Sequence, residues 1–416
     1  MNIRALAKNK LVSETLIYGI TNAVYSGLPL LLLPFLVATL GPEDYGYVDL
    51  FRSISMFLVP ILGLSTVQSI TRFYYDFDEK RFKIFVTSIQ LFQLLTSIIA
   101  TIIVCCLSPF LSDTYQILLL LSIAYFLFNQ FTEGLLAIYR VNNKAKSYLF
   151  IRVANILLEL GILFILFKVL QPLDWKFRVL PTVISSFLVA ILTIVQFVKL
   201  GYMFKFSSEL LKLGIMYSAP LVLHMLSGYV LNIGDRFFIK YYLSEKDLGN
   251  YAVAYQIGMA INFFYTSFNL AWTPTYFKWM QENKTNQIKK VRKLIYLIVP
   301  LLGILTLLVW FSFSDLFIKH SEYKISNQII IVVLIANVIL SLYKFESNFY
   351  LYTKDTKKLS IFTFISAIIS VVLNFALIPR IGIIGAAIAT LISFIVVYFL
   401  VLFSKKNDKI HQEPAF

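Results

Sequence analysis

Four basic residues lie within or at the edge of long apolar stretches of this chain: Arg52, Arg152, Arg236 and Lys344. A charge at the centre of a bilayer costs at least about 2.5–3.5 kcal/mol, so such a residue normally faces the protein interior or a water-filled passage. A guanidinium group binds phosphate with two parallel hydrogen bonds, whereas an ammonium acts as a compact charge. Together these residues would attract an anionic, phosphorylated substrate into a hydrated passage.

Three of these cations also have a purely structural explanation. Arg52 lies three residues after Asp49 on one helix face, which favours a local ion pair. Arg152 lies about one helical turn inside the predicted inner end of its stretch and Lys344 about two, so both side chains could extend to the membrane surface. Substrate contact and these alternatives both remain open from the sequence.

Polar residues recur at helical spacing within the apolar stretches. Arg152, Asn155 and Glu159 occupy positions i, i+3 and i+7, which places them on one face of a helix. Asn232 and Asp235 belong to a second stripe that also contains His224 and Gly228. Further stripes are Asn129 and Glu133; Asn262, Thr266, Asn269 and Thr273; Asn337, Ser341, Lys344 and Asn348; and Ser366, Ser370 and Asn374. Hydrogen bonds between membrane helices average only about 0.6 kcal/mol, so helix packing alone is a poor reason for so many stripes, which favours a hydrated central passage.

Three acidic residues are candidates for coupling transport to a cation gradient: Glu133, Glu159 and Asp49. Burial favours the neutral form of a carboxyl group, so Glu133 or Glu159 could carry a proton. The alternative is that Glu159 and Arg152, about two turns apart, form part of a structural network. Asp235 and Arg236 are adjacent, so we expect their side chains to point in different directions and to pair with other residues.

The sequence predicts no cofactor, no metal site and no enzyme. The three histidines lack the spacing of zinc ligands, and no phosphate-binding Gly-Lys-Ser/Thr loop occurs. Asp76 and Asp78 match the Asp-x-Asp pattern of nucleotide-sugar transferases, but they lie in a short loop without a nucleotide-binding fold. We therefore expect these two acids to be solvated. Cys105 and Cys106 are adjacent in a helix and point in different directions, which is typical of small apolar side chains rather than a redox pair.

These residues must be positioned by membrane helices. The chain is 59% hydrophobic with a mean hydropathy of +0.78, and a helix of about 20 apolar residues spans a bilayer core of about 30 Å. We predict an all-α integral membrane protein with twelve transmembrane helices. The predicted spans are residues 11–40, 47–70, 82–107, 115–139, 147–170, 179–198, 213–239, 248–277, 294–314, 325–352, 359–378 and 381–403.

Basic residues alternate between the connectors. Every second connector, counted with both termini, carries 25 Lys and Arg, whereas the intervening connectors carry eight. Short loops rich in Lys and Arg remain cytoplasmic, so both termini should be cytoplasmic. The net charge of +15 then lies on the cytoplasmic face, where it meets anionic membrane lipids, and nucleic-acid binding is not expected.

The chain also contains an internal repeat. Leu40–Tyr47 and Leu243–Asn250 share Leu, Asp and Gly at an offset of 203 residues, close to half of the 416-residue chain. Six spans return the chain to its starting side, so we predict two pseudo-symmetric six-helix lobes in parallel orientation. The predicted lobes are residues 1–200 and 201–404, followed by a cytoplasmic tail at 405–416. The first and seventh spans are the richest in Gly and Pro. Ordinary kinks for helix packing explain these residues too, but corresponding interruptions in the two halves favour a cavity-lining role.

Three groups of segments resemble polysaccharide transporters of the Wzx type, in the multidrug/oligosaccharidyl-lipid/polysaccharide exporter superfamily. They are Leu40–Tyr47 with Gly63–Thr66 and Arg72–Tyr74; Asp235–Ile239 with Leu243–Tyr255; and Asn374–Arg380 with Gly382–Ala387. Lipid II flippases of the same superfamily resemble the chain less, because they typically have fourteen spans.

The resemblance implies a V-shaped, MATE-like transporter of two six-helix lobes in a bacterial inner membrane. It would flip an undecaprenyl-pyrophosphate-linked oligosaccharide by alternating access for O-antigen, capsule or exopolysaccharide synthesis. H⁺ or Na⁺ would be the coupling ion, and a polysaccharide polymerase and chain-length proteins would be partners. The substrate-contact residues carried over are Arg52, Arg152, Arg236 and Lys344. The polar stripes add Asn155, Asn232 and Asp235 as further predicted residues of the substrate cavity.

The leading alternative is a cation-coupled multidrug exporter of the same superfamily. An exporter of small cations should present a net acidic cavity, whereas the four basic residues within the spans argue against one. A membrane-bound polymerase or ligase would carry catalytic Arg or His on a large outer loop, and no long outer connector is predicted.

Overall fold

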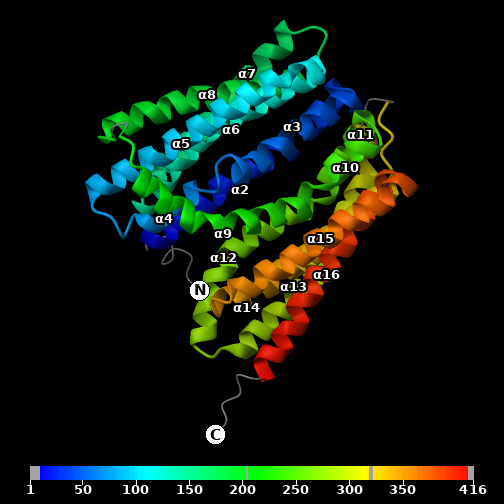
Figure 1. The fold of residues 1–416 in the computed structure, drawn as a ribbon. Helices are drawn as coiled ribbons and strands as arrows, with labels where there is room; N and C mark the ends of the chain where they lie inside the picture. The colour runs from blue at the N-terminus through cyan, green and yellow to red at the C-terminus, as the bar shows by residue number, and fades with distance from the viewer. Residues whose placement is uncertain (1–9, 203–204, 318–321, 411–416) are drawn as a thin grey trace. The chain divides into compact units, whose positions relative to one another are not determined.

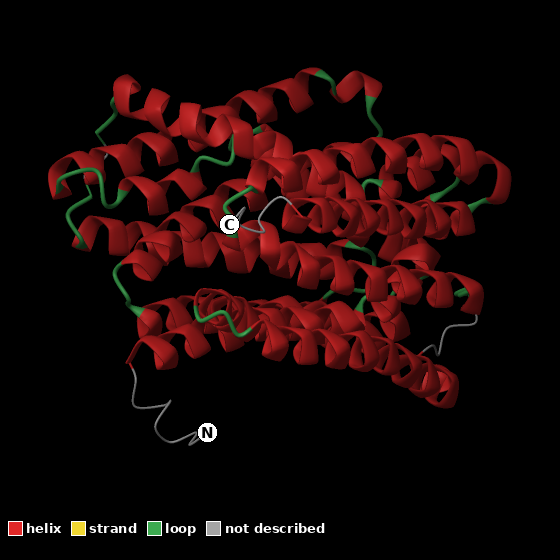
Figure 2. Cartoon of the chain, turned by 90° about the horizontal axis from the view of Figure 1, so that it is seen from below, coloured by secondary structure: helices red, strands yellow, loops and turns green. Residues whose placement is uncertain are grey.

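The computed structural model describes residues 10–202, 205–317 and 322–410. The described residues form helices joined by short connectors and contain no strand (Figures 1 and 2). Nine helices among them are long and apolar enough to cross a membrane. They are α5 (Glu79–Cys106), α6 (Asp113–Val141), α7 (Ala145–Val169), α8 (Lys176–Lys199), α9 (Ser208–Ile233), α13 (Thr285–Phe317), α14 (Asn327–Tyr352), α15 (Thr356–Ile381) and α16 (Ile383–Ile410). These nine helices confirm an all-helical, multi-pass membrane protein.

The other predicted spans also correspond to helices. They are α2 (Lys10–Thr39), α3 (Pro42–Ile61), α4 (Val67–Phe73), α10 (Asp235–Tyr242), α11 (Glu245–Gly258) and α12 (Ala260–Gln281), and a 3₁₀ turn, η1 (Ser108–Phe110), follows α5. The predicted span 47–70 is interrupted between α3 and α4, and the span 248–277 is interrupted at Met259. The segments in the first and seventh spans that are rich in Gly and Pro stay largely helical: α2 continues through Pro29 and Pro34, and α9 continues through Pro220.

The interruption between α3 and α4 has a local cause. Leu64 and Ser65 adopt positive φ angles of 45° and 55°, a conformation that L-residues rarely adopt and that ends a helix. The amide of Ser65 then donates to Val59 O, and the amide of Thr66 donates to Gly63 O, in place of the carbonyls four residues earlier. The backbone amides of Ser65 and Thr66 therefore still form hydrogen bonds within the chain. Such bonds are needed in a membrane interior, where no water is available to replace them.

The chain divides into two compact units. Unit 1 comprises residues 1–25 and 47–226, and its helices α5, α6, α7 and α8 pack against one another (Figure 1). The unit 1 core contains large, fully buried side chains, including Phe85, Ile89 and Leu135. These residues bury apolar area between helices whose outer faces are also apolar.

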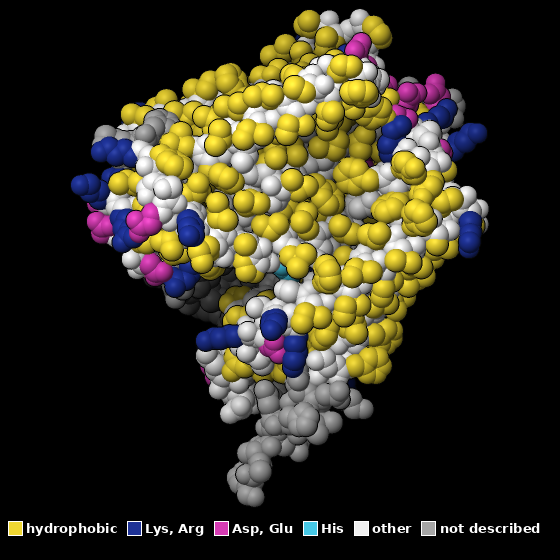
Figure 3. Space-filling model, in the orientation of Figure 1, with side chains coloured by type: hydrophobic (Ala, Val, Ile, Leu, Met, Phe, Trp, Pro, Cys, Tyr) yellow, Lys and Arg dark blue, Asp and Glu magenta, His cyan; other side chains and the backbone are white. Residues whose placement is uncertain are grey.

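Unit 2 comprises residues 26–46 and 227–416, and α14, α15 and α16 form its most closely packed group. Trp272 of α12 stacks on Phe345 of α14, with ring centroids 5.5 Å apart. Hydrophobic side chains cover the faces of the helices, while Lys and Arg gather near their ends (Figure 3). This distribution is expected of helices that meet lipid tails along their length and headgroups at their ends.

Candidate functional site

Two buried charged residues of helix α7, Arg152 and Glu159, are each bonded to an opposite charge on a neighbouring helix. Arg152 Nη2 lies 2.6 Å from Glu133 Oε1 of α6. Glu159 Oε1 lies 2.8 Å from Arg178 Nη1 of α8 and accepts a hydrogen bond from Thr182 Oγ1 at 3.0 Å. The predicted polar stripe of α7 therefore holds three helices of unit 1 together through ion pairs. Asn155, between the two charges, is also buried.

Arg178 is a partner that the sequence analysis missed, because it was counted in an outer connector. Both ion pairs join residues 19 positions apart: Glu133 with Arg152, and Glu159 with Arg178. This equal separation follows from two successive antiparallel helix pairs with short connectors. Glu159 and Arg178 lie on either side of the predicted turn between two spans. A search for opposite charges at similar distances before and after such a turn could have identified Arg178.

Asp235 and Arg236 contradict the prediction that they pair with other residues. Arg236 Nη1 lies 2.5 Å from Asp235 Oδ1, and both side chains are buried. Arg236 Nη1 also donates to the carbonyl oxygen of Asn232, 3.0 Å away and one turn earlier. The prediction was wrong because the long arginine side chain folds back toward the last turn of α9, which brings its guanidinium beside the preceding residue.

The remaining groups around this pair complete its hydrogen bonding. Asp235 accepts hydrogen bonds from Tyr251 Oη and from Thr390 Oγ1. The guanidinium of Arg236 lies 4.1 Å from the ring centroid of Tyr255, and this contact also stabilises a buried cation. The charges of Asp235 and Arg236 thus compensate each other inside unit 2, while Asn232 Nδ2 donates to Gly228 O.

Two predicted polar stripes face each other in unit 2. Lys344 Nζ of α14 donates to Asn262 Oδ1 of α12 at 2.8 Å. One turn further along α14, Asn348 Nδ2 donates to Asn269 Oδ1, and Asn348 Oδ1 accepts from Thr273 Oγ1 at 2.8 Å. The sequence spacing therefore correctly placed these residues on matching faces of two helices that are distant in sequence.

The predicted residues are divided between the two units. Arg52 is exposed on α3, and Asp49, one turn earlier, is half-buried. Arg152, Asn155, Glu133 and Glu159 belong to unit 1. Lys344, Asn232, Asp235 and Arg236 belong to unit 2. Each unit therefore has its own set of intramembrane charges.

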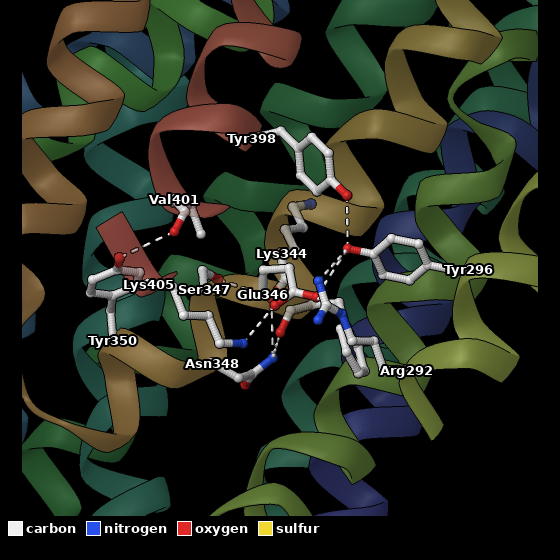
Figure 4. Close-up of polar contacts among 11 residues, drawn as sticks. Arg292, Tyr296, Lys344, Glu346, Ser347, Asn348, Tyr350, Tyr398, Val401 and Lys405 are labelled. Carbon is white, nitrogen blue, oxygen red and sulfur yellow. Dashed lines mark hydrogen bonds and ion pairs between the residues drawn. The ribbon is translucent and has the colours of Figure 1, made fainter. Parts of the chain in front are cut away.

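A further buried charge cluster surrounds Glu346, which the sequence analysis did not single out (Figure 4). The Glu346 side chain is fully buried, with 0% exposure. Its Oε1 lies 2.7 Å from Arg292 Nε of α13, and its Oε2 lies 2.6 Å from Lys405 Nζ of α16. Tyr296 Oη also donates to Glu346 Oε1 at 3.0 Å and lies 2.7 Å from Tyr398 Oη. Arg292, Tyr296 and Lys405 thus contact the Glu346 carboxylate of α14 directly, and Tyr398 joins this cluster through Tyr296. The cluster links α13 and α16 to α14.

Glu346 was missed for two reasons. It lies between Lys344 and Asn348 in the sequence, but it does not belong to the polar stripe that contains these two residues, whose members recur every three to four residues. Its cationic partners Arg292 and Lys405 were assigned to a cytoplasmic connector and to the cytoplasmic tail, whereas both lie within long helices, α13 and α16, that extend past the apolar stretch. A search for the partners of an acidic residue inside a predicted span should therefore include basic residues just outside the ends of the neighbouring spans.

The other sequence candidates behave as loop or surface groups. Asp76 pairs with Arg72 at 2.7 Å, and Asp78 accepts from the amide of Arg81 at the start of α5, which confirms that they are ordinary loop acids. Cys105 and Cys106 are exposed free thiols. Among the described residues, no group of three or more His, Cys, Asp or Glu side chains is arranged to hold a metal ion. His320 and His411 lie outside the described residues, as does the end of the predicted tail after residue 410.

Known proteins resemble this chain in sequence and in fold. Residues 11–280 match the polysaccharide biosynthesis protein family, and residues 220–376 match the MatE family. A protein of the Lsg locus of Haemophilus influenzae is 26% identical over 91% of this chain and 95% of its own length. An uncharacterized membrane protein of the same organism is 25% identical over 86% of this chain and 88% of its own length.

Solved structures of membrane transport proteins share the fold. The lipid II flippase MurJ in an inward closed conformation aligns with a TM-score of 0.72 and 16% identity, over 94% of this chain and 87% of its own. An inward-facing multidrug resistance transporter of the MATE family aligns with a TM-score of 0.69 and 16% identity, over 97% and 96% of the two chains. Because the family match covers more than half of the sequence, this multi-pass membrane protein belongs to the polysaccharide biosynthesis protein family.

Proposed function

We propose that the protein is a flippase for oligosaccharides linked to undecaprenyl pyrophosphate. It would move the lipid-linked repeat unit from the cytoplasmic to the outer leaflet of a bacterial inner membrane for O-antigen, capsule or exopolysaccharide synthesis. This proposal includes twelve spans, cytoplasmic termini and alternating access between two lobes. The family match and the MurJ-like fold support it.

The observation that carries the proposal is the environment of Lys344. Its ammonium donates to the neutral amide of Asn262, and within the described ranges no carboxylate forms an ion pair with it. Arg152 and Arg236, by contrast, are paired with Glu133 and Asp235. A membrane-embedded cation whose charge is not compensated attracts an anionic group, so Lys344 is our primary candidate for contact with the pyrophosphate.

The other predicted contacts take different parts in this proposal. Arg52 is exposed and would contribute a second cation for acidic sugars or pyrophosphate. Asn155, Asn232 and the two ion-paired arginines would shape the passage rather than supply free charge. Glu133, Glu159 and Asp49 remain proposed coupling groups for H⁺ or Na⁺, and a polymerase and chain-length proteins remain proposed partners.

The multidrug exporter alternative is less consistent with the described charges. Four buried or partly buried carboxylates form ion pairs with arginine or lysine side chains: Glu133, Glu159, Asp235 and Glu346. Because each carboxylate lies beside a basic partner, these ion pairs present little net negative charge to a small organic cation.

Deletion with complementation tests the proposal. Surface polysaccharide and the lipid-linked intermediate would be measured in a deletion strain that carries the wild type, Lys344→Ala, Lys344→Arg or Lys290→Gln. We expect Lys344→Ala to lower the polysaccharide and accumulate the intermediate, and Lys344→Arg to restore much of the activity. Lys290, an exposed residue of α13, is the control for loss of one positive charge. Normal polysaccharide in the deletion strain, with no paralogue able to substitute, would overturn the proposal.

A further inference from the structure

Unit 1 contains a pocket of about 440 Å³ at the end of its helix bundle where three connectors meet. The connectors join α4 to α5, α6 to α7 and α8 to α9, at the left end of the bundle in Figure 1. The lining residues used below are Lys83, Glu79, Lys144, Leu200 and Tyr202. A volume of this size is within the range that holds small ligands or headgroups.

The charge of the pocket is positive. Lys83 and Lys144 supply two cations, while Glu79 supplies one anion and lies 2.7 Å from Lys83 Nζ. The Lys83 ammonium also lies 5.8 Å from the ring centroid of Tyr202. Gly201, with φ of +76°, allows this approach, because a Cβ there would lie 3.2 Å from Lys83 Nζ. Lys144 is exposed, so its charge is available to a ligand.

The walls of the pocket offer both apolar rings and hydrogen-bonding groups. The Tyr202 side chain is buried, and burial raises the pKa of its phenol, which therefore stays neutral at physiological pH. Tyr74 Oη donates to Asn142 Oδ1 at 2.8 Å across the pocket wall. This combination suits a ligand with an anionic group and a few hydroxyl groups.

Exposed apolar side chains lie on the parts of α7 and α8 that adjoin the pocket-forming connectors. Leu200 lines the pocket, and Val198 and Val195 precede it on α8 with exposures of 60% and 42%. Phe150, on the first turns of α7, is 66% exposed. A ligand that carries acyl chains could therefore place its headgroup in the pocket and its tails on these helix faces.

We propose that this pocket binds the headgroup of an anionic phospholipid. Basic pockets between membrane helices on the cytoplasmic side are typical binding sites for acidic lipid headgroups. The connectors that form this pocket belong to the lysine-rich and arginine-rich set predicted to be cytoplasmic, where inner-leaflet phosphates are available. Lys83 and Lys144 would contact the phosphate, and the apolar faces of α7 and α8 would contact the acyl chains.

The test measures lipid binding to the purified full-length protein in detergent by native mass spectrometry. Dioleoyl phosphatidylglycerol, dioleoyl phosphatidylethanolamine and soluble glycerol 3-phosphate would be titrated separately. We expect phosphatidylglycerol to bind more tightly than the other two, because only this lipid combines a net negative headgroup with acyl chains. Equal binding of the two phospholipids would overturn the proposal. Equal binding of glycerol 3-phosphate would show a free phosphate site and would also overturn it.

Variants assign the binding to the pocket. The double variant Lys83→Gln, Lys144→Gln should weaken phosphatidylglycerol binding about tenfold or more, because each lysine near an anionic lipid contributes a comparable attraction. Leu200→Trp should weaken binding by filling the pocket without changing its charge. The control is the double variant Lys289→Gln, Lys290→Gln, which removes the same number of positive charges as the pocket double variant but from unit 2. It should bind phosphatidylglycerol like wild type. Wild-type affinity in both pocket variants would contradict the assignment. This outcome is independent of flipping, because binding is measured without the oligosaccharide substrate.

Discussion

Gly46 and Gly249, 203 residues apart, lie at a symmetric crossing of the first turns of α3 and α11 in unit 2. A Cβ on Gly46 would lie 2.0 Å from the carbonyl oxygen of Glu245, and a Cβ on Gly249 would lie 1.7 Å from that of Pro42. Pro42 and Glu245 are also 203 residues apart, so each turn contacts the equivalent position of the other. The weak sequence repeat therefore corresponds to a pair of turns in direct backbone contact.

The first prediction concerns this crossing. Gly249→Ala should strongly destabilise the protein, because its Cβ would overlap a backbone carbonyl that cannot move without shifting a helix. Thermal unfolding in detergent, followed by fluorescence size exclusion, measures the effect. Gly228→Ala is the matched control, since no atom lies within 4 Å of its added Cβ, and it should be neutral or stabilising by up to about 1 kcal/mol. Equal melting temperatures for both variants would contradict the close contact.

The second prediction concerns the Glu346 cluster. Glu346→Gln should lower the stability by about 3–5 kcal/mol, because the Arg292 and Lys405 cations would lose their shared carboxylate. Denaturant or thermal unfolding of unit 2 helices would report the loss. Glu282→Gln removes an acid from a surface connector, where its side chain is partly exposed beside Lys284, and should change stability little. A Glu346→Gln protein as stable as wild type would show that the carboxylate does not hold α13, α14 and α16 together.

The third prediction concerns the buried pair of Glu159 and Arg178. Arg178→Met should be strongly destabilising, because Glu159 would remain buried without its cation. The double variant Glu159→Leu, Arg178→Met should recover most of the lost stability, since it leaves no unpaired charge. A double-variant cycle of melting temperatures measures the coupling. Additive losses in the double variant would indicate that the two residues act independently, and would exclude a shared structural role.

The sequence predicted which segments are helical because long apolar stretches have few alternatives in a membrane. It also predicted that Asn262 and Lys344 lie on polar helix faces, since helical spacing alone defines a face. It did not predict which helices are broken. Leu64 and Ser65 interrupt a span that contains one proline, Pro60, whereas α2 continues through Pro29 and Pro34. The number of prolines therefore does not decide where a helix is broken, because packing around the helix decides whether a proline or a strained turn is tolerated.

Charge partners were harder to predict than helices. Arg178, Arg292 and Lys405 were assigned to connectors, because hydropathy places a helix boundary at the membrane surface rather than at the end of the helix. The side chains of these residues reach back into the bundle and meet buried carboxylates. The pairing of Asp235 with Arg236 depended on a side-chain conformation, which sequence spacing does not specify.

The most direct test of the account is flipping of a fluorescently labelled undecaprenyl-pyrophosphate oligosaccharide by the purified protein in liposomes. Accessibility of the labelled headgroup to an external quencher would be followed for wild type, Lys344→Ala, Lys344→Arg and Lys290→Gln. We predict flipping by wild type and Lys290→Gln, at least tenfold slower flipping by Lys344→Ala, and partial recovery by Lys344→Arg, because one lost charge contact to phosphate is worth about 1.4 kcal/mol or more. Wild-type rates in Lys344→Ala, with all proteins folded to the same extent, would contradict the role of Lys344. No flipping by wild type would contradict the proposed function itself.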